Sequence, residues 1–315
     1  MVIFKDTPPI LPPRYRGRFA PSPSGPLHIG SLLAAMASRL EARAHGGEWL
    51  VRIEDLDPPR EQPGASAAIL RTLEALGFEW DGEVSYQSQR HALYEAALQQ
   101  LREAGLAYPC GCTRREIADS SLRGIDGPVY PGYCRHGLAP GRSARAWRLR
   151  VAPGVEIAYT DAIQGRRVQA LASEVGDFIL RRADGYFAYQ LAVVVDDAAQ
   201  GVTDVVRGAD LLDSTPRQVY LCQCLGLKAF RYAHLPVLVN EAGEKLSKQT
   251  LAPAVEVTEG AALLVRVLRY LGQTVPKELE TVSIAEVWRW ADAHWSLEAV
   301  PKRLGIPVQA AMGGM

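Results

Sequence analysis

Near the start of the chain, a Pro/Gly-rich turn joins a predicted strand directly to a predicted helix. The turn is Pro21-Ser-Pro-Ser-Gly-Pro-Leu-His-Ile-Gly-Ser31, between a strand over 15–20 and a helix over about 29–45. The start of a helix offers free backbone N–H groups and the positive end of its dipole, so it suits phosphate. His28 can donate to a phosphate oxygen, and Gly30 lets another group approach the backbone closely. The segment therefore predicts an anion site at a strand–helix junction.

Strands and helices alternate along the first third of the chain, which predicts a parallel, doubly wound sheet. A second strand over 49–53 ends in the acidic loop Glu54-Asp-Leu-Asp57. Helices are expected over 65–77 and 89–105, each closed by a glycine. Such sheets bind ligands beyond the carboxyl ends of their strands, which is where both loops fall.

A second candidate ligand loop lies far along the chain, at Lys245-Leu-Ser-Lys-Gln249. Two lysines and a serine close to Gly243 suit a clamp on a polyphosphate. Taken alone, such a segment is more often an exposed charged loop, and a lone histidine more often caps a helix. The two motifs indicate a phosphate-binding site mainly because both occur in this chain, in this order.

The composition is that of an ordinary globular protein, with 48% apolar residues among 315. No apolar run approaches the length of about 18 residues that a membrane span needs. The N-terminus does not resemble a signal peptide, so we expect a cytoplasmic, monomeric protein without a membrane partner. Net charge is zero, and the arginines between Arg142 and Arg182 form either a solvated face or an RNA-facing surface.

Cys110, Cys112 and Cys134 form a candidate metal-ligand set. The five cysteines include two Cys-x-Cys pairs, which argues against a disulfide framework. Tetrahedral Zn²⁺ needs a fourth donor, and chemistry alone favours His136. The later Cys-x-Cys pair falls in a predicted helix, where residues two apart point in different directions, so we expect core cysteines there.

The two motifs resemble the HIGH and KMSKS signatures of class I aminoacyl-tRNA synthetases, with Ser31 in place of the second histidine. The resemblance runs from about residue 14 to about residue 252, and only about sixty residues follow. A bacterial glutamyl-tRNA synthetase would continue into a large anticodon-binding region, so the chain resembles the shortened glutamyl-Q tRNA(Asp) synthetases. The segments that narrow the resemblance to the glutamyl branch are Arg18-Phe-Ala-Pro-Ser22, Arg52-Ile-Glu-Asp-Leu-Asp57, Val205-Val-Arg-Gly-Ala-Asp210 and Ser214-Thr-Pro-Arg-Gln218.

The resemblance implies tRNA-independent activation of L-glutamate by ATP with Mg²⁺, then transfer of the glutamyl group to queuosine in the anticodon loop of tRNA(Asp). His28, Lys245 and Lys248 would act on the phosphates, since catalysis here is positioning and electrostatics. The implied ATP-binding residues are His28, Gly30, Ser31, Lys245, Ser247 and Lys248. The implied glutamate-binding residues are Arg18, Phe19, Ala20, Pro21, Ser22, Glu54, Tyr189 and Arg207.

Two arginines and one carboxylate would complement the two carboxylates and the ammonium of glutamate. Arg18 and Arg207 are the candidate arginines, and Glu54 is the candidate partner of the ammonium. The alternatives are an ordinary ion pair of Arg207 with Asp204 or Asp210, and core packing for Tyr189. The family also places a tyrosine as fourth metal ligand, and in this sequence the matching residue is Tyr130, with His136 as the alternative.

The expected fold is a Rossmann-type α/β catalytic domain with a zinc-bearing β insertion and a small helical C-terminal domain. Two other functions remain open at this point: a minimal glutamyl-tRNA synthetase that charges a tRNA 3′ end, and a non-catalytic glutamate or nucleotide sensor. The expected division is a leader over 1–14, Rossmann halves over 15–107 and 185–252, the insertion over 108–184 and helices over 253–315.

Overall fold

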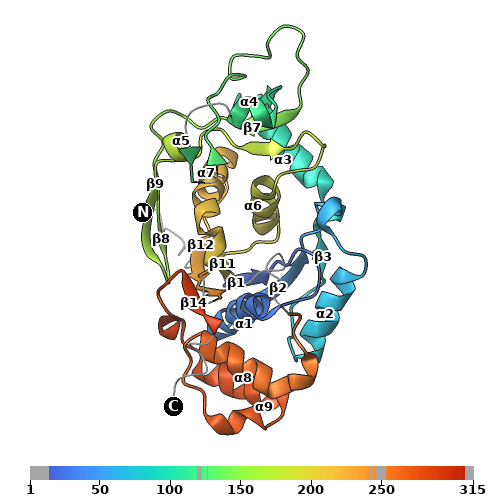
Figure 1. Ribbon diagram of the computed structural model, residues 1–315, viewed down its shortest axis with the longest axis vertical. Coiled ribbons are helices and arrows are strands. Elements are labelled where there is room, and N and C mark those ends of the chain that lie inside the picture. Colours follow the sequence, from blue (N-terminus) through green and yellow to red (C-terminus); the bar gives the residue numbers. More distant parts are fainter. Residues whose placement is uncertain (1–13, 119–122, 126, 241–242, 246–252, 309–315) are drawn as a thin grey trace, which may run out of the picture.

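A computed structural model describes residues 14–118, 123–125, 127–240, 243–245 and 253–308 (Figure 1). The α-helices are α1 Ile29–Ala44, α2 Ala65–Ala75, α3 His91–Glu103, α4 Arg114–Ala118, α5 Leu171–Glu174, α6 Tyr189–Ala199, α7 Thr215–Leu225, α8 Gly260–Tyr270 and α9 Ile284–His294. The strands are β1 Arg16–Phe19, β2 Glu48–Ile53, β3 Ser85–Tyr86, β4 Ala107–Cys110, β5 Arg123–Gly124, β6 Gly127–Pro128, β7 Ala146–Leu149, β8 Ile157–Asp161, β9 Gly165–Gln169, β10 Ile179–Arg181, β11 Asp204–Gly208, β12 Arg231–Leu235, β13 Val237–Val239 and β14 Gly305–Pro307.

The centre of the molecule is a parallel arrangement of five strands in the order β3-β2-β1-β11-β12. β2 pairs in parallel with β1 and β3, and β11 pairs in parallel with β12. β1 and β11 are adjacent, because the N–H of Thr203 donates to the carbonyl of Arg16 at 2.9 Å. The chain leaves β1 towards β2 on one side and returns to β11 on the other. The crevice at the carboxyl ends of β1 and β11 is therefore a topological switch point, where ligands bind in such sheets.

The predicted parallel α/β sheet is confirmed, and so is an antiparallel insertion within it. In that insertion β7 pairs antiparallel with both β4 and β10. The β8–β9 hairpin follows β7 in the chain, but it extends the central sheet, because β8 pairs with β12 through Asp161 and Tyr232.

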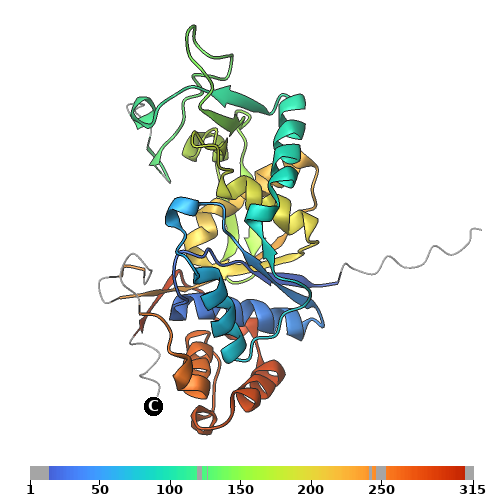
Figure 2. The same ribbon diagram turned by 90° about the vertical axis from the view of Figure 1, so that its right-hand side faces the viewer.

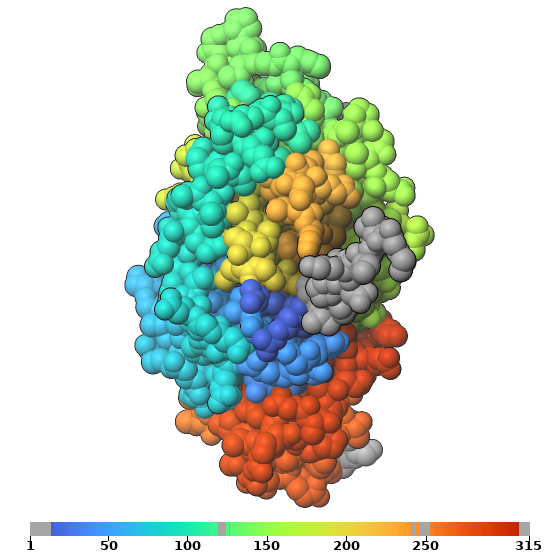
Figure 3. Space-filling model, turned by 180° about the vertical axis from the view of Figure 1, so that it is seen from behind, coloured from blue at the N-terminus to red at the C-terminus, as the bar shows by residue number. Residues whose placement is uncertain are grey.

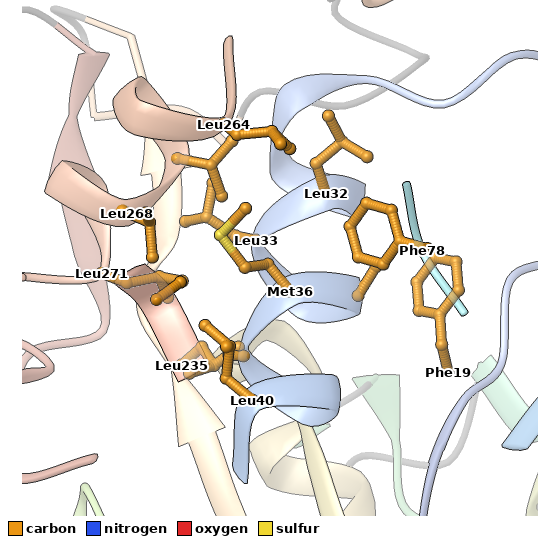
Figure 4. Packing of buried hydrophobic residues seen from close by; sticks show 14 of the residues in the cluster. Phe19, Leu32, Leu33, Met36, Leu40, Phe78, Leu235, Leu264, Leu268 and Leu271 are labelled. Atoms are coloured by element: carbon orange, nitrogen blue, oxygen red, sulfur yellow. The ribbon is translucent and has the colours of Figure 1, made fainter. Parts of the chain in front are cut away.

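Helix α1 contributes a buried face to the largest part of the hydrophobic core described for this fold. Leu32, Leu33, Met36 and Leu40 on this helix are almost fully buried. Figure 4 shows these side chains between Leu264, Leu268 and Leu271 of the C-terminal segment and the rings of Phe19 and Phe78. The C-terminal helices thus share one hydrophobic core with the first strand and helix.

Helix α9 begins at a capping box, in which the Ser283 and Glu286 side chains each accept from the other's backbone N–H. Its Trp288 is buried, stacks under the guanidinium of Arg39 at 4.1 Å and donates to the carbonyl of Leu76 at 2.8 Å. This helix is thereby fixed to α1 and to the end of α2.

Helix α4 and strand β7 lie near one end of the elongated molecule and helices α8 and α9 at the other, with the parallel strands between them (Figures 1 and 2). Figure 3 shows the molecule from behind, with α8 and α9 at the same end. None of the described helices combines the length and the apolar character that a membrane crossing requires.

We expect Gly77→Ala to lower the free energy of unfolding more than Gly105→Ala. Both glycines follow helices at positive φ, +73° and +69°, so alanine at either is strained by about 1–2 kcal/mol. A Cβ at Gly77 would lie 2.8 Å from Ile284 Cγ2 and 3.0 Å from Trp288 Nε1, whereas nothing lies within 4 Å at Gly105. Overpacking of this kind costs roughly 1–3 kcal/mol more. Urea unfolding measures the free energy of unfolding of both variants. Equal decreases in the two would contradict a tight contact between the end of α2 and α9.

Candidate active site

A cavity of about 950 Å³ lies at the carboxyl ends of β1 and β11. Its walls come from the loop after β1, the start of α1, the start of α6, β11 and the loop after β13. All eight residues predicted to bind glutamate line it, and so do His28, Gly30, Ser31 and Lys245. Ser247 and Lys248 lie outside the described residues.

The half of the cavity that is predicted to bind phosphate is built on the N-terminus of α1. His28 is the extended N-cap residue, and the predicted helix begins directly after it. A Cβ on Gly30 would lie 3.0 Å from His28 Cε1 and 3.1 Å from its Nδ1. The group that approaches the Gly30 backbone is therefore the His28 imidazole, so the glycine makes room for the histidine at the helix start.

Lys245 reaches the same cavity from a tight turn. The turn is closed by the N–H of Glu244, which donates to Asn240 Oδ1 at 2.9 Å, and by Gly243 at φ +78°. Lys245 Nζ lies 2.5 Å from Asp210 Oδ2, an exposed pair at the cavity wall. A phosphate group could compete for this ammonium, because exposed ion pairs contribute little net stability.

At the other end of the cavity, Arg207 on β11 is 5% exposed and held by neutral groups. Its Nη1 donates to the hydroxyl of Tyr189 at 3.2 Å, and its Nη2 donates to Thr215 Oγ1 and Gln218 Oε1 at 2.8 Å each. Its Nε donates to His234 Nε2 at 3.1 Å. The guanidinium is therefore fixed in place at the cavity wall.

No carboxylate of the described residues forms an ion pair with Arg207. The two carboxylates considered as its partners are engaged elsewhere: Asp204 with Arg231 at 2.6 Å and Asp210 with Lys245 at 2.5 Å. A buried charge is costly unless it is paired. The cavity next to Arg207 is therefore suited to an anion, which supports the functional interpretation of this arginine over the ordinary ion pair.

Arg18, the second predicted arginine, is already paired. It is 3% exposed, and its Nε and Nη2 donate to the carboxylate of Asp197 at 3.1–3.3 Å. The same carboxylate accepts from Nη1 of the fully buried Arg52 at 2.7 Å. Burial alone would raise the pKa of Asp197, but Arg18 and Arg52 lower it below its ordinary value. The role of Arg18 towards glutamate stays a prediction.

Sequence reasoning missed Arg52, Asp196 and Asp197. Asp196 is completely buried and accepts hydrogen bonds from Gln87, Arg90 and Tyr94. One sequence feature could have revealed the pair: adjacent aspartates stand directly after the apolar run Ala-Val-Val-Val. Carboxylates on a buried helix need cationic partners, and Arg52 stands in an apolar strand.

Glu54, the predicted partner of an ammonium, lines the cavity with a side chain that is 8% exposed. Its N–H donates to the carbonyl of Pro21 at 2.9 Å, which ties together the loops after β1 and β2. Its carboxylate accepts from Arg52 Nη2 at 3.2 Å. Burial raises the pKa of Glu54 despite the neighbouring arginines, so a cationic group from the cavity would stabilise its charged form.

The three predicted thiol ligands converge at the tip of the insertion, with all three sulfur atoms within 4.8 Å of one another. The Tyr130 hydroxyl lies 3.4 Å from Cys110 Sγ and 3.5 Å from Cys112 Sγ. His136 is exposed and is not part of this cluster. The geometry therefore favours Tyr130 over His136 as the fourth donor.

The guanidinium of Arg148 adds a positive charge to this cluster. Its Nε donates to Cys110 Sγ at 3.3 Å, and its carbon lies 4.0 Å from the centre of the Tyr130 ring. The later pair, Cys222 and Cys224, packs in a hydrophobic cluster, as predicted.

The arginine-rich segment does not present one continuous basic face. Arg142, Arg181 and Arg182 each form an ion pair with an acidic side chain, and Arg148 is buried. Both interpretations of this segment stay open.

Comparison with known proteins agrees with this site. Residues 14–302 match the model of the catalytic domain of class I tRNA synthetases for glutamate and glutamine (E and Q). A crystal structure of a glutamate tRNA ligase from Elizabethkingia meningosepticum, in complex with its amino acid, is similar with a TM-score of 0.77 and 25% identity, over 94% of this chain and 67% of that one.

Two relatives are much closer in sequence. A glutamyl-Q tRNA(Asp) synthetase from Dechloromonas aromatica is 62% identical over 92% of this chain and 96% of its own length. One from Aromatoleum aromaticum is 59% identical over 93% and 92%. The chain is therefore a class I aminoacyl-tRNA synthetase of the glutamyl and glutaminyl group. Within that group it belongs to the glutamyl-Q tRNA(Asp) synthetase family.

We expect Asp197→Asn to lower the free energy of unfolding by about 3–5 kcal/mol, because it leaves two buried arginines without their shared carboxylate. The matched control is Asp184→Asn, whose side chain is 44% exposed and pairs with Arg182, and which should cost about 0–1 kcal/mol. Denaturant unfolding at neutral pH compares the two. A loss no larger than that of the control would contradict the bridging role.

Proposed function

We propose that this protein activates L-glutamate with ATP and Mg²⁺, without tRNA, and transfers the glutamyl group to queuosine in the anticodon loop of tRNA(Asp). The observation that carries the proposal is Arg207, a buried and fixed cation that faces the cavity without a carboxylate partner among the described residues. Membership of the glutamyl-Q tRNA(Asp) synthetase family supports the choice of acceptor. A cytoplasmic location goes with these substrates.

In the first step, a carboxylate oxygen of glutamate attacks the α-phosphorus of ATP, and pyrophosphate leaves. His28 and the N–H groups at the start of α1 would hold the phosphates, with Lys245 at the opposite wall. Ser247 and Lys248 follow Lys245 in the sequence, lie outside the described residues and would complete the proposed phosphate clamp. Catalysis by these groups is electrostatic, because negative charge develops on the leaving pyrophosphate.

Glutamate would lie between Arg207 and Glu54. Arg207 would bind one carboxylate, with Tyr189 beside it, and Glu54 would bind the ammonium. The end of β1 and the loop after it, from Arg18 to Ser22, would line the same cavity beside the bound glutamate. In the second step a hydroxyl of the queuosine ring attacks the activated carbonyl, an ester forms and AMP leaves.

The two alternative functions are less well supported. A minimal enzyme that charges a tRNA 3′ end would leave unexplained why relatives at 62% and 59% identity are glutamyl-Q tRNA(Asp) synthetases. A sensor would not need a cavity that presents His28 and Lys245 for phosphates beside an amino-acid pocket.

We also propose one structural Zn²⁺ held by Cys110, Cys112, Tyr130 and Cys134. Three thiolates and a phenolate meet the coordination number of zinc, and the four donor atoms already lie close together. Bound zinc would fix the loop between β4 and β7. Arg148 would offset part of the negative charge of such a donor set.

The acceptor is tested with [¹⁴C]glutamate, ATP and tRNA(Asp) that contains or lacks queuosine. We expect label only on the queuosine-containing tRNA, and nuclease digestion should locate it in the anticodon loop. ATP–pyrophosphate exchange should proceed with glutamate alone. Label at the 3′ end would favour the minimal glutamyl-tRNA synthetase, and absence of both exchange and transfer would favour the sensor.

Arg207→Ala should raise the glutamate KM in pyrophosphate exchange by roughly 30- to 1000-fold, because a buried charged contact is worth about 2–4 kcal/mol. The ATP KM should stay near its wild-type value. Arg231→Ala is the matched control, since this arginine lies on the neighbouring strand, is exposed and pairs with Asp204. An unchanged glutamate KM in Arg207→Ala would remove Arg207 from the glutamate pocket.

Elemental analysis of freshly purified, reduced protein should find about one zinc per chain. Cys110→Ser and Cys134→Ser should lose it, and Cys224→Ser, outside the cluster, should keep it. Tyr130→Phe should weaken retention against a chelator, whereas His136→Ala should not. The reverse order of the last two variants would make His136 the ligand, and metal-free wild-type protein would contradict the site.

A further inference from the structure

Three buried side chains form a line that ends at Arg207. Asp161 closes β8, His234 lies on β12 and Arg207 lies on β11, with 1%, 0% and 5% exposure. Asp161 Oδ2 lies 2.6 Å from His234 Nδ1, and His234 Nε2 lies 3.1 Å from Arg207 Nε. Neither Asp161 nor His234 lines the cavity, so both would act on a ligand through Arg207, either directly or by way of Thr215, whose Oγ1 also lies 3.1 Å from His234 Nε2.

The hydrogen bonds determine which nitrogen of His234 carries the proton. Arginine has only donors, so His234 Nε2 must accept the hydrogen of Arg207 Nε. The ring is therefore protonated at Nδ1 and donates that proton to Asp161. Burial lowers the pKa of His234, which keeps the ring neutral, although the bond to Asp161 favours the charged form.

The carboxylate of Asp161 is also fixed in its orientation by hydrogen bonds. Its Oδ1 accepts from the N–H groups of Ile163, Gln164 and His234 at 3.0, 2.9 and 3.1 Å. Burial opposes ionisation, but these bonds and the His234 side chain lower the pKa of Asp161 below its ordinary value. One oxygen is thus committed to the backbone and the other to the histidine.

The neutral His234 ring keeps the carboxylate of Asp161 apart from the guanidinium of Arg207. An aspartate in direct contact with Arg207 would pair with the guanidinium and reduce its attraction for an incoming anion. With His234 in between, Arg207 Nε is fixed while the nearest carboxylate of this line stays one ring away. The other neighbours, Tyr189, Thr215 and Gln218, are neutral as well. By donor count, one Nη1 hydrogen remains for a ligand.

We propose that Asp161 and His234 are positioning residues, which hold Arg207 in a binding orientation and leave its charge for the carboxylate of the substrate. This inference rests on the proposed function, because it assigns the anion at Arg207 to glutamate.

Asp161→Asn tests the proposal with an almost isosteric change. The amide oxygen should keep the three backbone N–H groups, so the new NH₂ group would face His234 Nδ1. The ring would then carry its proton on Nε2, where Thr215 Oγ1 can accept it but Arg207 cannot, so the Nε–H of Arg207 would lose its acceptor. We expect the glutamate KM in pyrophosphate exchange to rise about 10- to 100-fold, with the ATP KM and kcat nearly unchanged.

Combining Asp161→Asn with a substitution of His234 distinguishes a positioning role of Asp161 from a merely structural one. His234→Gln has no imidazole ring, so Asp161 no longer selects which ring nitrogen carries a proton. The glutamine amide oxygen can still accept a hydrogen bond from Arg207. In that background, Asp161→Asn should add little to the glutamate KM. The control for surface charge is Asp184→Asn, which should leave all constants unchanged. An equal effect of Asp161→Asn in both backgrounds, or no effect in the wild-type background, would overturn the proposal.

A direct measurement covers the case in which Asp161→Asn does not fold. ¹⁵N NMR of histidine-labelled wild-type protein should show a neutral histidine protonated at Nδ1 whose signal His234→Gln removes. His45 and His294 also place Nδ1 against carbonyl oxygens, so the assignment depends on the signal that disappears in His234→Gln. An Nε2–H form for that ring would overturn the proposal whatever the kinetics. If instead Arg207→Ala leaves the glutamate KM unchanged, the proposed glutamate pocket fails. If only Asp161→Asn has no effect, the positioning role fails and the pocket stands.

Discussion

The carboxylate of Asp197 joins three elements on which the cavity depends. It binds Arg18 at the end of β1 and Arg52 on β2, and it belongs to α6, which also carries Tyr189 into the cavity wall. Buried ion pairs are often no more stabilising than apolar residues of the same volume. The contribution of Asp197 is therefore best understood as geometric, since only one packing of α6 against the two strands satisfies both guanidinium groups.

Arg18 and Arg207 illustrate two ways to bury a guanidinium beside one ligand site. Arg18 is neutralised by a carboxylate within the fold and can shape the wall without drawing an anion strongly. Arg207 is surrounded by a hydroxyl from each of Tyr189 and Thr215, an amide and a neutral imidazole. The protein thereby concentrates the attraction for a carboxylate at one end of the cavity.

The sequence predicted the parts of the site that lie within short segments. The Pro/Gly turn before His28 and the cysteine trio each combine residue types whose chemistry is readable locally, and the structure has α1 and the thiol cluster where they were expected. Pairings across the chain could not be predicted: Arg18 meets Asp197 from 179 positions away, and His234 meets Asp161 from 73. Such contacts depend on the order of the strands in the sheet, which the spacing of apolar residues along the sequence does not reveal.

The close contact between Gly30 and the ring of His28 also has an entropic consequence. A side chain that is free before binding loses rotational freedom when a ligand orders it, at about 0.5–1.5 kcal/mol for a rotamer-rich group. The backbone of Gly30 gives the His28 ring a surface on which it already rests. Much of its ordering is therefore completed when the chain folds, and a nucleotide bound at the proposed phosphate site would meet a donor that is already oriented.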